Sequence, residues 1–109
     1  MSITSDLIRG HTDTIILSRL IQGDSYGYEI NKYIKIKTNN EYELKEATLY
    51  STFRRLEEGG MIISYWGNEN KGARRRYYSI TDKGKETLEI QKKDWKKTKE
   101  LIDSLIFYV

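Results

Sequence analysis

Hydrogen-bond donors that suit phosphates and base edges are concentrated in two stretches of the sequence. In residues 46–58, one helical face would carry Tyr50, Ser51, Arg54 and Arg55. Further along lies a basic cluster that runs into a tyrosine pair, made of Lys71, Arg74, Arg75, Arg76, Tyr77 and Tyr78. Arginine and short hydroxyl side chains bind phosphate oxygens and the edges of bases. The two stretches together predict nucleic-acid binding, although each alone is also compatible with an ordinary solvated surface.

The formal net charge of +3 hides an uneven distribution along the chain. Residues 71–99 hold 11 Lys and Arg against 4 Asp and Glu, which is a local net charge of +7. The rest of the chain holds 8 against 12, a net charge of −4. A locally basic surface attracts polyanions, so double-stranded DNA is the partner we expect.

The side chains that catalysis and metal binding usually need are scarce. The chain has no cysteine and one histidine, His11, which excludes thiol nucleophiles, disulfides, and metal sites built on thiolates or imidazoles. There is no glycine-rich phosphate loop either. We therefore expect no cofactor and no enzyme activity. A hydrolase built on paired carboxylates is the open alternative, but no carboxylate stands in an apolar context that would raise its pKa.

The N-terminal sequence predicts a cytoplasmic protein. Its first ten residues lack the basic stretch and apolar run of a secretion signal. No segment approaches the roughly 20 apolar residues that a membrane span requires, so we expect no membrane partner.

Periodicity and glycine positions predict a mainly α-helical fold with one small β-hairpin. We expect a first helix over about Ser5 to Gln22, which is apolar on several sides and therefore central. Gly23-Asp24-Ser25 would end it and precede a second helix, which Lys37–Asn40 would end. A third helix is expected over about Glu46 to Glu58, with a buried stripe of Leu49, Phe53 and Leu56.

Two β-rich runs follow the glycine pair Gly59-Gly60. Residues Met61 to Trp66 and Arg74 to Ile80 would pair as a hairpin around the polar loop Gly67 to Ala73. Because Arg76 shares a side of its strand with Tyr78 and Ile80, part of the arginine cluster is expected to brace the fold. Helices followed by a hairpin are the order of a winged helix-turn-helix, whose third helix enters the major groove and whose hairpin is the wing.

One long helix would then run from Thr81-Asp82 to the C-terminus, with either of these residues as its cap. A seven-residue repeat places Leu88, Trp95, Ile102 and Val109 on one seam, which a single helix cannot bury. We therefore expect residues 1–80 to form a DNA-binding domain and residues 81–109 a dimerisation helix. The apolar residues crowded into its final turns, which we expect at the dimer interface, are Leu101, Ile102, Leu105, Ile106, Phe107 and Val109.

The sequence resembles the PadR family of winged-helix transcriptional repressors over nearly its whole length. The resemblance rests on residues 26–29 (YGYE), 46–60 (EATLYSTFRRLEEGG), 62–67 (IISYWG) and 72–81 (GARRRYYSIT). Ser51 replaces the proline that many relatives have after the TLY tyrosine. The resemblance implies a repressor that binds palindromic operator DNA as a homodimer. It assigns DNA contacts to Tyr50, Ser51 and Arg54 of the third helix and to Lys71, Arg74 and Arg75 of the wing. Lys45, just before the third helix, is a further candidate phosphate contact.

The last helix resembles that of the smaller PadR subfamily, which includes the lactococcal multidrug-resistance regulator. In that subfamily the tryptophan at the position of Trp95 faces its symmetry mate across a planar apolar ligand, whose binding would release the operator. Polar Gln91 and Thr98 beside Trp95 also predict a loosely packed seam. We expect a planar aromatic molecule here, neutral or anionic because of the nearby lysines, and the alternative is that Trp95 is interface core. The candidate ligand-binding residues are His11, Thr14, Leu88, Lys92, Trp95 and Lys99.

The rival interpretation from another class is a winged-helix module that binds proteins and not DNA, because the fold alone does not determine function. Such a module would present an apolar third-helix face. The expected face is polar and basic, which favours DNA.

Overall fold

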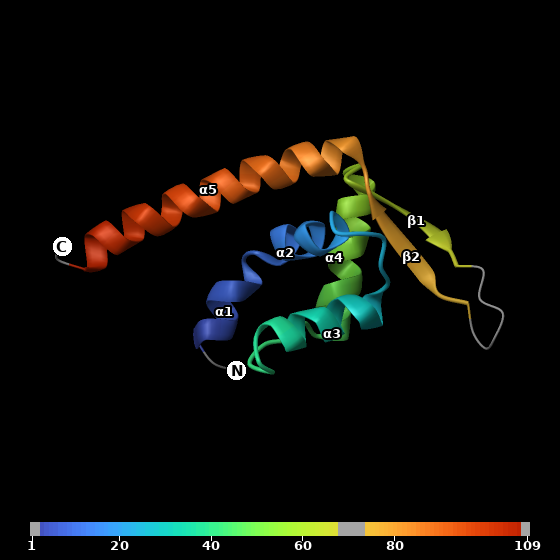
Figure 1. Cartoon of the computed structure of the whole chain (residues 1–109), viewed down its shortest axis with the longest axis horizontal. Coiled ribbons are helices and arrows are strands. Elements are labelled where there is room, and N and C mark those ends of the chain that lie inside the picture. Colours follow the sequence, from blue (N-terminus) through green and yellow to red (C-terminus); the bar gives the residue numbers. More distant parts are fainter. Residues whose placement is uncertain (1–2, 68–73, 108–109) are drawn as a thin grey trace.

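The computed structural model describes residues 3–67 and 74–107 and shows a mainly helical chain with one antiparallel hairpin (Figure 1). The hairpin and the C-terminal end of the longest helix lie at opposite ends of the molecule. The elements in chain order are α1 (Ile3–Arg9), α2 (Thr12–Leu20), α3 (Gly27–Lys37), α4 (Glu46–Glu58), β1 (Ile62–Trp66), β2 (Arg76–Ile80) and α5 (Asp82–Ile106).

The N-terminal region differs from the expected single helix, because α1 and α2 are separate helices. The chain turns at Gly10-His11, where the amide of His11 donates to the carbonyl of Ile8 at 2.8 Å. The hydroxyl of Thr12 donates to the carbonyl of Arg9 at 2.7 Å and so satisfies an acceptor that the interrupted helix leaves open. The predicted central helix is therefore α2 alone.

A continuous apolar core joins α2, α3 and α4 to the hairpin and the start of α5. The stripe predicted for α4 is buried, and α2 contributes three residues that are almost inaccessible to solvent. The core residues are Ile16, Leu17, Leu20, Ile30, Ile34, Leu44, Leu49, Phe53, Leu56, Ile62, Tyr78 and Leu88. This cluster sets the relative positions of α4 and the hairpin.

The hairpin is confirmed, with strands one to two residues shorter than predicted. Its register pairs Ile62 with Ile80 and Trp66 with Arg76. The structure adds a short bridge that the sequence did not indicate: Ser25, before α3, exchanges backbone hydrogen bonds of 2.8 and 3.2 Å with Tyr78. Tyr78 also stacks on Phe53 of α4 with ring centroids 3.8 Å apart. The segment before α3 and the helix α4 thus both hold the hairpin in place through Tyr78.

The junction between the hairpin and α5 is tightly braced. Of the two predicted caps, Thr81 is the one that caps α5, because its hydroxyl accepts from the amide of Gly84 at 3.1 Å and donates to the carbonyl of Gly60 at 2.7 Å. A Cβ atom on Gly84 would lie only 2.2 Å from the carbonyl oxygen of Met61, so this position admits glycine alone. The direction of α5 is therefore set by backbone contacts at its first turn.

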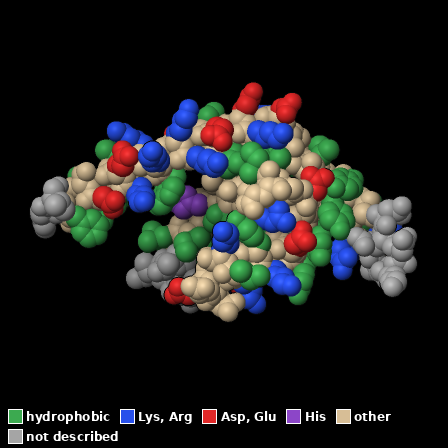
Figure 2. Space-filling model, in the orientation of Figure 1, with side chains coloured by type: hydrophobic (Ala, Val, Ile, Leu, Met, Phe, Trp, Pro, Cys, Tyr) green, Lys and Arg blue, Asp and Glu red, His purple; other side chains and the backbone are tan. Residues whose placement is uncertain are grey.

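The two halves of α5 have different surroundings. Leu88 is fully buried against the core, and α2 packs along this first part of the helix. From Lys92 onward every described residue is exposed. Figure 1 shows this second half projecting past the N-terminal helices, and Figure 2 shows hydrophobic side chains at its far end beside many lysines.

Candidate nucleic-acid interface

The outward face of α4 presents the donors expected from the sequence. Tyr50, Ser51 and Arg54 are all exposed on it, and Lys45 is exposed directly before the helix. The hydroxyl of Ser51 donates to the carbonyl of Thr48 at 3.1 Å, which leaves its oxygen lone pairs available as acceptors. This face is polar, in contrast to the buried stripe on the opposite side.

Tyr50 packs against the fold as well as facing solvent. Its ring lies edge-on to Phe53, with centroids 5.7 Å apart. A Cβ atom on Gly27 would come within 2.9 Å of the Tyr50 hydroxyl oxygen, so the glycine at the start of α3 makes room for the tyrosine. Tyr50 therefore joins the first turn of α3 to α4, a role that the sequence alone did not indicate.

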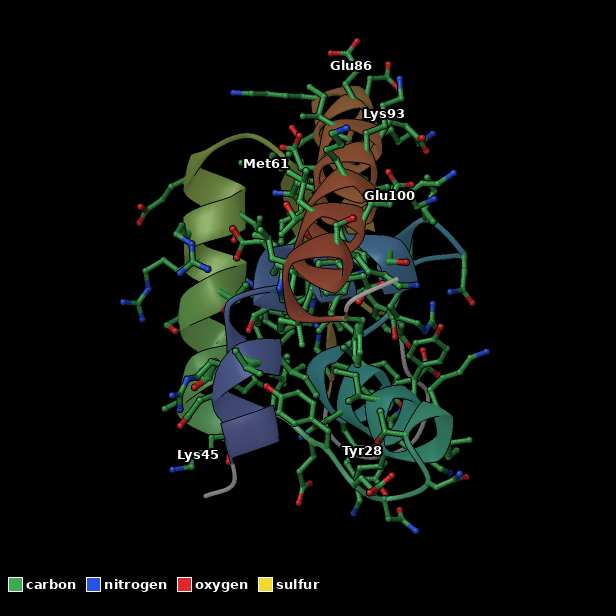
Figure 3. All side chains as sticks on the ribbon, turned by 90° about the vertical axis from the view of Figure 1, so that its left-hand side faces the viewer. Tyr28, Lys45, Met61, Glu86, Lys93 and Glu100 are labelled. Atoms are coloured by element: carbon green, nitrogen blue, oxygen red, sulfur yellow. The ribbon has the colours of Figure 1, made fainter. Side chains whose placement is uncertain are left out.

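A surface depression of about 320 Å³ lies at the N-terminus of α4. Lys45 is at its edge, and Figure 3 shows this lysine at the end of α4 that lies nearest α1. Arg9 of α1 and Lys35 of α3 also line it, neither of which the sequence singled out. Glu41 and Glu43 line it as well, Lys35 pairs with Glu43 at 3.9 Å, and Arg9 pairs with Asp6 at 2.6 Å. The depression is therefore of mixed charge, and Lys45 is its one lining cation without an ion pair among the described residues.

The consecutive arginines of the wing have three different environments. Arg76 forms an ion pair with Glu57 of α4 at 3.7 Å and donates to the hydroxyl of Ser64 at 2.7 Å, so it braces the fold as expected. The guanidinium of Arg75 lies 4.9 Å from the ring centroid of Tyr26. Arg74 lies 5.5 Å from the ring centroid of Trp66. Arg74 and Arg75 are both exposed, whereas Lys71 is outside the described residues.

The face of the hairpin opposite Arg76 and Trp66 carries a tyrosine pair. Tyr65 stacks on Tyr77 across the strands with centroids 5.7 Å apart, and Tyr77 meets Tyr26 edge-on at 5.3 Å. The hydroxyl of Tyr65 donates to Asp24 at 2.5 Å, and this hydrogen bond raises the pKa of Tyr65. Burial raises the pKa of Tyr78 on the face toward α4. Both tyrosines thus keep their protons at neutral pH.

The N-terminal turn of α2 connects α4 to α5. Arg55 of α4 forms an ion pair with Asp13, so it is not available to DNA in the way that Arg54 is. At the next residue, the hydroxyl of Thr14 donates to the side-chain oxygen of Gln91 at 2.8 Å. The sequence did not identify either link, because the partners lie 42 and 77 residues apart.

The predicted ligand-binding residues are brought together only in part. The rings of His11 and Trp95 meet edge-on with centroids 4.8 Å apart, and Thr14 lies nearby through its bond to Gln91. Lys92 and Lys99 are exposed, and Lys92 pairs with Glu89 at 3.6 Å. Leu88 is placed differently from the expectation: it is fully buried in the core and lines no surface. Its apolar side chain packs inside the chain because α2 covers that part of α5.

The residues expected at a dimer interface lie on the exposed end of α5. Leu105 is 82% exposed and Ile106 60%, which is high for aliphatic side chains. Leu101, Ile102 and Phe107 are exposed too, and Val109 lies outside the described residues. Within the same described part, no helix combines the length and the apolar character of a membrane span.

The fold and these surfaces define a class of protein: winged helix-turn-helix regulators of transcription. The family comparison then gives the particular group. The chain belongs to the transcriptional regulator PadR-like family, whose model matches residues 16–90. This is a family of transcription regulators and not of enzymes.

Individual relatives agree with this assignment. A transcriptional regulator from Clostridium thermocellum has 54% sequence identity and a TM-score of 0.86, covering 94% of this chain and 99% of that one. A PadR family regulator from Clostridium difficile has 39% identity and a TM-score of 0.77, covering 88% and 98%. The negative transcriptional regulator PadR of Bacillus subtilis is 28% identical over 73% of this chain, which corresponds to 42% of that protein.

Proposed function

We propose that this PadR-family protein binds palindromic operator DNA as a homodimer and represses transcription, with α4 in the major groove and the hairpin along the phosphate backbone. The observation that carries the proposal is the attachment of the hairpin to α4. Tyr78 stacks on Phe53, and Arg76 pairs with Glu57. The polar face of α4 and the wing arginines therefore form one surface of defined geometry, as a duplex requires.

The second copy is supported by the exposed end of α5. Contiguous exposed apolar residues on a helix mark an association surface, and a symmetric pairing of two such helices would bury them. Two copies related by a two-fold axis would present two α4 helices to half-sites about one helical turn of DNA apart. Repression is supported by the likeness to the negative regulator of B. subtilis. Because its target is DNA, we place its action in the cytoplasm.

Duplex binding at several salt concentrations tests the DNA proposal. Replacing Arg74 and Arg75 with alanine should weaken binding to all sequences and flatten the salt dependence, because phosphate contacts release counterions. Tyr50→Phe or Arg54→Ala should alter the preference between sites. Lys93→Ala is the matched control, since Lys93 lies on α5 at the other end of the view from Lys45 (Figure 3). Unchanged affinity and slope in the wing variant would remove the wing from the interface.

We also propose that a planar aromatic molecule, neutral or anionic, binds beside Trp95 and releases the operator. The edge-on contact of His11 with Trp95 and the half-exposed indole support a flat apolar surface there. The exposed amines of Lys92 and Lys99 would disfavour a cation.

Matched cationic and anionic aromatic dyes test the ligand proposal through tryptophan fluorescence. The anionic dye should quench more strongly at equal concentration. In Trp95→Ala, Trp66 is the remaining tryptophan, and the quenching should disappear. Quenching that persists in this variant would remove the pocket. Tighter binding of the cation would overturn the charge argument and leave the pocket in place.

A further inference from the structure

The indole of Trp66 lies beside two guanidinium groups at the base of the wing. Its ring centroid is 5.5 Å from the guanidinium carbon of Arg74 and 5.7 Å from that of Arg76. These distances are within the range of cation–π attraction, for which tryptophan offers the best face. The ring is 52% exposed, so it is not held there by burial alone.

Arg76 anchors this arrangement to α4. Trp66 and Arg76 are directly paired across the strands, and Arg76 is tied to Glu57 and Ser64. A guanidinium with two polar partners has few orientations left, so it presents a defined surface to the indole. The position of Trp66 is therefore set relative to α4 through Glu57 and Arg76.

Arg74 differs from Arg76 in its polar partners within the described part of the chain. Among the described residues, no ion pair involves Arg74, in contrast to Arg76. Contact with an aromatic face leaves the N–H groups at the edge of a guanidinium directed away from the ring. The contact also restricts the rotamers of the arginine before DNA binds, so less side-chain entropy is lost on binding.

We propose that Trp66 is a positioning residue for the DNA contact made by Arg74, holding its guanidinium over the indole so that its donors face a phosphate. The inference rests on the proposed DNA-binding function and adds a specific part to it. Three contacts in sequence, from Glu57 to Arg76, from Arg76 to Trp66 and from Trp66 to Arg74, fix the place of Arg74 relative to α4. Trp66 itself touches no DNA in this scheme.

A double-mutant cycle with Trp66→Leu and Arg74→Gln tests the proposal, with duplex affinity measured by anisotropy across a salt series. Arg74→Gln should lower the salt slope by about one. Trp66→Leu should leave the slope unchanged and weaken binding about two- to fivefold, as expected for an exposed cation–π contact. In the Trp66→Leu background, Arg74→Gln should cost less than in the native protein, by a similar factor. Trp66→Phe should restore most of the affinity, because it keeps an aromatic face.

The DNA-free protein provides a second readout. The side-chain NMR signal of Arg74 should be displaced by the indole ring current and return toward its ordinary position in Trp66→Leu, while the backbone amides of α4 stay in place. If the native protein binds duplex DNA but the two substitutions act additively, or the Arg74 signal does not respond, the role of Trp66 is refuted and the function stands. If the native protein binds no duplex at any salt concentration, the proposed function fails and the role of Trp66 fails with it.

Discussion

The part of the chain up to Gln91 and the part from Lys92 to Phe107 share the helix α5, yet only the first contributes residues to the buried core. Up to Gln91, twelve hydrophobic residues form one buried cluster that includes Leu88 of α5. Beyond it, α5 continues for four turns in which every described residue is exposed. The same helix therefore passes from a largely buried environment to an exposed one.

The comparison shows that the seven-residue repeat of α5 passes through two different surroundings. The repeat relates Leu88, Trp95 and Ile102, but Leu88 is fully buried, whereas Trp95 meets His11 edge-on and stays half exposed, as does Ile102. Mutations along one seam should consequently fall into two groups. Those in the first half should alter folding of the chain itself, and those in the second half should alter association.

The largest effect is expected from removing the end of the outward half. Deleting residues 99–109 should abolish the stable dimer and give a monomer or an aggregate, because the crowded apolar turns of α5 are lost. Sedimentation of the variant at micromolar concentration is the measurement, and the winged domain should keep its helical circular dichroism. A stable dimer after the deletion would show that the two halves do not differ in this way.

Leu88→Ala and Ile102→Ala should separate the two halves next. The first creates a cavity in the core and should lower the free energy of unfolding by about 2–5 kcal/mol, at every protein concentration. The second should lower the apparent stability mainly through dissociation, so its effect should depend on protein concentration. Urea unfolding at two concentrations distinguishes them, and concentration dependence in Leu88→Ala would contradict its placement in the monomer core.

A smaller effect is expected at the junction where α5 begins. Thr81→Ala removes a cap that satisfies the amide of Gly84 and should cost about 0.5–2 kcal/mol of stability. Thr81→Ser keeps the hydroxyl and serves as the matched control. Thermal unfolding of both variants checks this, and an equal loss in the serine variant would mean that the methyl group and not the cap matters.

The smallest effect concerns the ion pair between Asp13 and Arg55. Both side chains are partly solvated, at 32% and 59% exposure, so a double-mutant cycle to alanine should give a coupling of about 0.2–1 kcal/mol in stability. The coupling should shrink at high salt. A coupling that is several times larger, or insensitive to salt, would indicate that the pair is part of the core of the first half.

Local signals in the sequence predicted most of the fold. The stripe of α4, the hairpin and the cap at Thr81 depend on neighbours within a few residues, and the structure confirms them. The break at Gly10-His11 was missed because the apolar pattern continues through it. The bridge of Ser25 to Tyr78 was missed because it joins residues far apart in the chain.

The residues of the candidate site also fall into two groups: those whose placement local patterns predicted and those whose placement depends on long-range contacts. Exposure of Tyr50, Ser51 and Arg54 followed from helical periodicity, and the bracing role of Arg76 followed from strand alternation. The burial of Leu88 did not follow, because heptad spacing cannot tell which partner a seam will meet. The aromatic partners of Arg74 and Arg75 depend on tertiary contacts that no local pattern contains.

The braced first turn of α5 has a mechanical consequence. Since Gly84 abuts the carbonyl of Met61 and Thr81 is bonded to Gly60, the first turn of α5 is fixed to the winged domain, and we expect the two to move together. The helix is a lever of 25 residues, about 37 Å long at 1.5 Å per residue. A rotation of about 5° where two such levers cross would displace the far end by about 3 Å, close to the rise of one base pair. Small adjustments between the paired helices would thus be magnified into changes of half-site spacing.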